Sequence, residues 1–140
     1  MEKKTKIIIA GVGIGAVTTA GIGYYFMTKV VTKPITIGDI NFKQVVATTG
    51  KLIVEFSRQD CEWCHKLASE IDAIKGNYAL SGVRFANYSL DTDKTEAASL
   101  GVGSKLPAMV FYKDGKKVQT LIGYQTRDVL QSEIKKVYGV

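Results

Sequence analysis

The chain divides into one continuous apolar segment and a longer region in which apolar and polar residues alternate. Residues 7–28 form a run of 22 positions without a charge, and lysines lie on both sides of it. A helix of this length covers roughly 30 Å, the thickness of the hydrocarbon core of a bilayer. The pattern predicts one membrane-spanning helix within residues 1–28. The basic residues before it favour a cytoplasmic N-terminus and an extracytoplasmic C-terminal domain in a single-pass protein of the cell membrane.

A cleaved signal peptide is the alternative for the same segment. The small residues at positions 18–20 would suit cleavage, but the apolar run continues well past Ala20, which favours an uncleaved anchor. We therefore expect an anchor at 1–28, a linker at 29–38 and a single folded domain at 39–140. A linker of about ten residues spans at most roughly 35 Å and would keep this domain close to the membrane.

Changes of periodicity after residue 38 predict an element order of α-β-α-β-α-β-β-α. Short apolar or alternating runs predict four strands, at residues 51–57, 83–90, 108–112 and 117–122. Helical spacing of apolar residues predicts helices at 39–49, after residue 64 up to Gly76, at 93–100 and after Thr126. In the last helix we expect four side chains to face inward: Val129, Leu130, Ile134 and Val137.

The strand pattern predicts the fold class. Strand 51–57 is apolar on both faces, which is typical of a central strand. Strands that alternate with helices indicate a parallel pair, and Asp114-Gly115 predicts a hairpin that adds an antiparallel edge. We expect an α/β fold in which a mixed, four-stranded central sheet is flanked by helices and preceded by the N-terminal transmembrane helix.

The charge of the chain argues against a nucleic-acid partner. The formal net charge is +6, but the charged residues are scattered and form no long basic run. Such a distribution is typical of a solvated surface rather than of a nucleic-acid-binding face.

The chain has only two cysteines, Cys61 and Cys64, and they directly follow the predicted central strand. Their spacing fits a reversible disulfide, part of a metal site or, with His65 next in sequence, the attachment motif of a c-type haem. A helix N-terminus stabilises a thiolate, so Cys61 at the helix start is predicted to attack and Cys64, one turn later, to resolve the mixed disulfide.

The other chemistries find less support in the sequence. A haem would need a second axial ligand, which with one histidine in the chain has to be a methionine such as Met109. A structural zinc site needs four ligands, whereas Cys61, Cys64 and His65 supply at most three. We therefore expect no metal and no cofactor. A non-catalytic binding module with a structural disulfide stays open as an alternative.

Residues 39–138 resemble the thioredoxin superfamily. The likeness rests on residues 53–56 leading into Cys61-Glu62-Trp63-Cys64, then Leu106-Pro107-Ala108 entering a strand, then the turn at 113–116, then Gly123. It implies a thioredoxin-like fold and dithiol–disulfide exchange through the two cysteines. It also implies that Pro107 is cis and faces them, and that the Leu106 backbone pairs with an extended substrate segment.

Two further residues follow from that resemblance. Glu55 occupies the position of the family's buried acid, where aspartate is more usual, and a buried carboxyl would have a raised pKa and could accept a proton from Cys64. Trp63 departs from the family pattern and either contacts substrate or covers the motif. The acidic Asp60 and Glu62 beside Cys61 disfavour its thiolate and predict a moderate redox potential.

Within the superfamily, the chain resembles membrane-anchored oxidoreductases of Gram-positive bacteria, some of which accompany secreted bacteriocins. Because the short linker keeps the domain close to the membrane, we expect its substrates among the thiols and disulfides of secreted or membrane proteins. We also expect a redox partner that resets the dithiol, which the sequence does not identify. The sequence leaves oxidation, reduction and isomerisation open.

Overall fold

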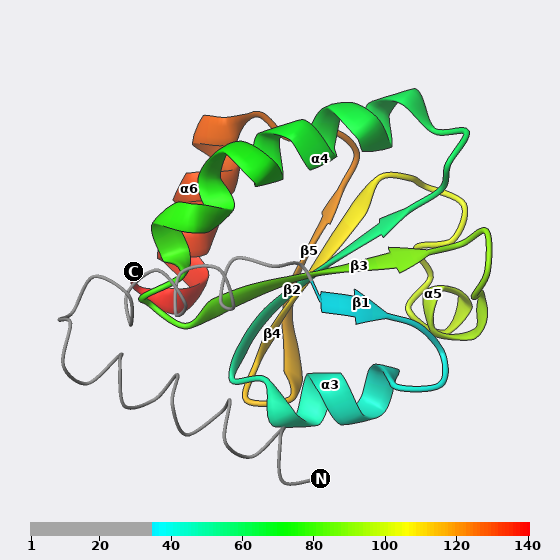
Figure 1. Ribbon diagram of the computed structural model, residues 1–140, viewed down its shortest axis with the longest axis horizontal. Helices are drawn as coiled ribbons and strands as arrows, with labels where there is room; N and C mark the ends of the chain where they lie inside the picture. The colour runs from blue at the N-terminus through cyan, green and yellow to red at the C-terminus, as the bar shows by residue number, and fades with distance from the viewer. Residues whose placement is uncertain (1–34) are drawn as a thin grey trace, which may run out of the picture.

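The computed structural model describes residues 35–140 (Figure 1). The predicted anchor at 1–28 lies outside these residues. Among residues 35–140, no helix combines the length and the apolar character that crossing a bilayer requires.

The strands are β1 (Ile35–Ile37), β2 (Lys51–Ser57), β3 (Val83–Ser89), β4 (Ala108–Lys113) and β5 (Lys116–Ile122). The helices are α3 (Phe42–Thr48), α4 (Glu62–Ile74), the 3₁₀ helix η1 (Lys75–Tyr78), α5 (Thr95–Ser99) and α6 (Arg127–Tyr138).

The strands form one mixed sheet in the order β1-β3-β2-β4-β5. β2 lies at its centre, parallel to β3 on one side and antiparallel to β4 on the other, which confirms the prediction for residues 51–57. The turn at Asp114 and Gly115 joins β4 to β5 as an antiparallel hairpin, and both residues adopt the positive φ that such a turn requires.

The prediction of four strands was wrong, because the sheet has five. β1 comprises only three residues, within the segment predicted as a linker, and pairs parallel with β3. A run of three residues is too short to show the alternation that identifies a strand in the sequence. Its identity as a strand depends on pairing with residues 86–88, which lie about fifty positions later in the chain.

Helices cover both faces of the sheet (Figure 1). An apolar core lies between the sheet and the helices on each face. Alternate residues of β2 point to opposite faces, so Val54 and Phe56 pack against α3 and α5 while Ile53 packs against α4 and α6. Glu55 follows Ile53 by two positions and therefore points toward α4. The same alternation places Asn87 of β3 on that face, two residues after Phe85.

Three of the four side chains of α6 that were predicted to face inward do so. Leu130 and Ile134 are completely buried and Val137 packs against the same core. Val129 was wrongly predicted to face inward, since 42% of its surface is exposed. Val129 and Leu130 both fit the helical spacing of apolar residues, but the face of α6 that packs on the sheet buries only Leu130.

Candidate redox site

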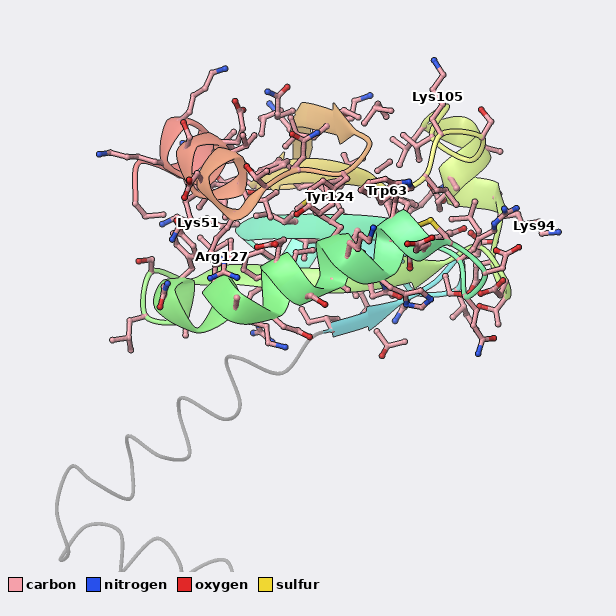
Figure 2. All side chains as sticks on the ribbon, turned by 90° about the horizontal axis from the view of Figure 1, so that it is seen from above. Lys51, Trp63, Lys94, Lys105, Tyr124 and Arg127 are labelled. Carbon is pink, nitrogen blue, oxygen red and sulfur yellow. A yellow bond between two sulfur atoms is a disulfide. The ribbon has the colours of Figure 1, made fainter. Side chains whose placement is uncertain are left out.

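The two cysteines lie at the N-terminus of α4, directly after β2, and are joined as a disulfide (Figure 2). Cys61 is the N-cap of this helix, and its Sγ atom accepts a hydrogen bond of 3.2 Å from the Cys64 backbone N–H. Cys61 is half-buried, whereas Cys64 is only 2% exposed. An incoming thiol therefore reaches the sulfur of Cys61 more readily than that of Cys64.

The acidic residues on each side of Cys61 are paired with bases. Arg58 Nε lies 3.2 Å from Asp60, and Lys66 Nζ lies 3.2 Å from Glu62. All four side chains are largely exposed, so each pair is weak. These bases nevertheless offset part of the repulsion that the sequence predicted for a thiolate at Cys61.

His65 is exposed, and its ring contacts the loop that precedes α4. Its Nε2 atom lies 2.8 Å from the Gln59 carbonyl oxygen, and because a carbonyl only accepts, Nε2 carries the hydrogen and donates it. Met109, the predicted second haem ligand, is completely buried in the core between the sheet, α4 and α6. Within residues 35–140, no group of three or more histidine, cysteine, aspartate or glutamate side chains could hold a metal ion.

Glu55 is buried beneath α4, with 6% of its surface exposed. Its Oε2 atom accepts a hydrogen bond of 3.3 Å from Asn87, whereas Oε1 has no partner among the residues that the structure describes. Burial disfavours the charged carboxylate and raises the pKa of Glu55 to about 7, although the Asn87 hydrogen bond opposes this. The carboxyl can therefore accept or release a proton near neutral pH.

Two hollows give access to Glu55. The larger, of about 400 Å³, is also lined by Cys64, His65 and Asn87. The smaller, of about 160 Å³, lies between β2, β3 and α4 and is mostly apolar. Glu55 and Cys64 thus line the same hollow, as a proton transfer between their side chains would need.

The predicted substrate-binding residues come together on the Cys61 side of the disulfide. The Leu106–Pro107 peptide bond is cis, as the resemblance implied. Leu106 and Pro107 line a pocket of about 340 Å³ together with Trp63, Gly123 and Tyr124. An adjoining pocket of about 300 Å³ contains Cys61, and Trp63 and Leu106 line both pockets. These pockets form a continuous surface beside the accessible sulfur.

Two residues of the site were not predicted from the sequence. Asn87 holds Glu55 and donates a second hydrogen bond of 2.9 Å to Ser57. Tyr124 lies against Trp63, with ring centres 5.5 Å apart (Figure 2). The available signals were a polar residue on the face of β3 that carries Val83 and Phe85, and an aromatic residue directly after Gly123.

Comparisons with known proteins agree with this geometry. The family model described as thioredoxin matches residues 33–136. A thioredoxin of Porphyra purpurea is 30% identical over 99 residues, which cover 70% of this chain and 91% of that protein. A thioredoxin of Alicyclobacillus acidocaldarius is 26% identical over 103 residues, covering 74% of this chain and 96% of that protein.

Solved structures show the same fold. A mutant thioredoxin from Halobacterium salinarum superposes with a TM-score of 0.69 at 20% identity, covering 78% of this chain and 94% of that one. A Malassezia sympodialis thioredoxin superposes with a TM-score of 0.68 at 24% identity, covering 77% of this chain and 92% of that one.

Proposed function

The chain belongs to the thioredoxin family, and we propose that it is a thiol–disulfide oxidoreductase that acts on secreted or membrane proteins through Cys61 and Cys64. One observation carries the proposal: the disulfide lies between two hollows of different character. On the Cys64 side is the hollow with the buried carboxyl of Glu55, and on the Cys61 side is the surface that includes Pro107. Proton transfer and substrate binding are thereby separated on the two sides of the reacting bond.

In the reducing direction, the Cys61 thiolate attacks a substrate disulfide, forms a mixed disulfide and releases one substrate thiolate. Cys64 then loses its proton to Glu55 and attacks the Cys61 sulfur. This second step breaks the mixed disulfide, forms the Cys61–Cys64 disulfide and releases the other substrate thiolate. Two electrons pass from the protein to the substrate. In the oxidising direction the same steps run backwards, and Glu55 returns the proton to Cys64.

The assignment of the two cysteines follows from their positions. Cys61 lies at the N-terminus of α4, where the backbone N–H groups and the helix dipole stabilise a thiolate. Cys64 is buried, and so its sulfur can reach only a partner already attached at Cys61. Removal of Cys64 should therefore leave substrate trapped on Cys61, whereas removal of Cys61 should abolish exchange.

We place the reaction outside the cell on the pattern of residues 1–28, which fits an uncleaved membrane anchor with basic residues before it. The expected test is fractionation of cells that express the full chain. The protein should remain in alkali-washed membranes, and protease added to intact protoplasts should digest the C-terminal domain. Recovery of the domain in a protected, membrane-free fraction would contradict this location.

Activity is tested by reduction of insulin and by refolding of a scrambled disulfide protein. Cys61→Ser should abolish both reactions. Equal activity of wild type and Cys61→Ser would end the enzyme proposal and leave a binding module with a structural disulfide. Capture of mixed disulfides with Cys64→Ser, followed by identification of the trapped chains, would report the substrates and the redox partner together.

A further inference from the structure

Trp63 is a large apolar side chain at the accessible end of the disulfide. It is 54% exposed and is the only tryptophan in the chain. An exposed ring on a helix has several rotamers available, and ordering it costs side-chain entropy. Two contacts hold this ring: Tyr124 at 5.5 Å between ring centres, and the Lys66 ammonium at 4.2 Å from the ring centre.

Tyr124 is itself fixed at both ends. It follows Gly123, whose positive φ turns the chain and whose N–H donates a 2.7 Å hydrogen bond to the Pro107 carbonyl. Its hydroxyl donates a 3.2 Å hydrogen bond to Oε1 of Glu70 on α4. The tyrosine thus bridges the proline segment and α4, which are the two sides of the 340 Å³ pocket.

Glu70 is the residue of α4 that binds the Tyr124 hydroxyl. Trp63, Lys66 and Glu70 follow one another at intervals of three and four residues and so lie on one face of α4. The second oxygen of Glu70 accepts a 3.0 Å hydrogen bond from Arg127 Nε at the start of α6. The Glu70 side chain is 23% exposed, which leaves it less screened than the other ion pairs near the disulfide.

We infer that Glu70 is a positioning residue that fixes Tyr124 against Trp63, and that this aromatic pair selects substrates carrying a large apolar side chain beside the reacting cysteine. The inference rests on the proposed function. The pocket that such a side chain would enter is lined by two aromatic rings, Leu106, Pro107 and Gly123, without a charged residue. Burial of an apolar side chain is most favourable in a pocket whose lining is itself apolar.

The test separates binding from catalysis. The full-length chain, oxidised so that its disulfide is intact, is titrated with two extended peptides whose central residue is serine in place of cysteine. The peptides differ only in the next residue, phenylalanine or alanine. Fluorescence of Trp63 reports binding. We expect wild type to prefer the phenylalanine peptide about tenfold, the effect of burying one such ring.

Glu70→Ala and Tyr124→Phe should each reduce that preference to about threefold, because each removes the same hydrogen bond. The double variant should lose no more than either single variant. Glu133→Ala is the matched control. Glu133 is a 19% exposed glutamate that accepts a 2.9 Å hydrogen bond from Gln119 but lines none of the pockets beside the disulfide, and its removal should leave the preference unchanged.

Three outcomes would overturn the inference: a wild type without preference, a Glu70→Ala variant with the full preference, or loss in Glu70→Ala but not in Tyr124→Phe. Thermal unfolding of each variant identifies any loss that reflects instability. Insulin reduction by the wild type is measured in parallel. An inactive wild type that still shows the Glu70-dependent preference would refute the proposed function alone, and an active one without that dependence would refute only this inference.

Discussion

Glu55 and Asn87 lie directly opposite each other on the parallel strands β2 and β3, and the Asn87 amide donates a 3.3 Å hydrogen bond to the Glu55 carboxyl. Asn87 is thus the hydrogen-bond partner of one carboxyl oxygen, while the other has no hydrogen-bond partner within residues 35–140. Desolvation outweighs this hydrogen bond and raises the pKa of Glu55 to about 7.

Glu55→Gln should slow the resolving step about 100-fold, since glutamine cannot accept the proton of Cys64. In wild type, this rate should rise with pH through about 7 as Glu55 ionises, and the variant should lack this inflection. Release of a substrate from its mixed disulfide with Cys61, followed in single-turnover experiments from pH 5 to 9, measures both effects. Glu133→Gln is the control. An unchanged inflection in Glu55→Gln would assign it to another group.

The same carboxyl should make the stability of the oxidised protein depend on pH. A carboxyl whose pKa is raised by folding stabilises the protein below the pKa of its unfolded state, here 4.5, and this contribution is lost as the pH rises through about 7. The free energy of unfolding of wild type should therefore fall by about 3 kcal/mol more than that of Glu55→Gln over this window. Urea unfolding at pH 4.5, 6 and 7.5 tests this, and parallel curves for both proteins would contradict it.

Asn87→Ala should move the Glu55 inflection to higher pH by about one unit. Its hydrogen bond stabilises the ionised carboxylate, and the loss of such a bond makes ionisation less favourable. Ser57→Ala is the matched control, because it removes the other hydrogen bond of Asn87 without touching Glu55 and should shift the inflection much less. The infrared band of the protonated carboxyl, followed during titration, gives the pKa without relying on turnover. A shift to lower pH would refute this role.

Sequence patterns predicted the parts of the site that depend on local order. The bounds of strand 51–57 were predicted as the structure has them. A run of apolar residues between polar ones can be recognised from the sequence of the strand alone. The position of the cysteines at the start of α4 follows from their place after that strand. The cis bond before Pro107 was implied by the resemblance to a family.

The parts that were missed depend on contacts between segments distant in sequence. Asn87 meets Glu55 only because β3 pairs with β2 in one register, and a slip of one residue would turn its side chain to the other face. Tyr124 reaches Glu70 across 54 residues of sequence. β1 is a strand only because it pairs with β3. Neither periodicity nor motif spacing carries this information.

Tyr138 anchors the end of α6 to the centre of the sheet. Its buried hydroxyl lies 2.9 Å from the carbonyl oxygens of both Leu52 and Tyr112, which are opposite each other on β2 and β4. The one hydroxyl hydrogen is shared between these two acceptors. The Tyr112 hydroxyl is also buried, but it has no hydrogen-bond partner among the residues that the structure describes. These two tyrosines form a matched pair for measuring what a buried hydroxyl contributes.

Tyr138→Phe should destabilise the protein by about 1–3 kcal/mol, because it removes the hydrogen bond and leaves two buried carbonyl groups without that donor. Tyr112→Phe should be neutral or stabilising, because it removes a hydroxyl that burial has desolvated without compensation; the same burial raises the pKa of Tyr112 to about 12. Each free energy of unfolding is measured by urea denaturation of the oxidised protein at one pH. Equal effects of both substitutions would show that the hydrogen-bonded hydroxyl of Tyr138 adds no more to stability than the unpartnered hydroxyl of Tyr112.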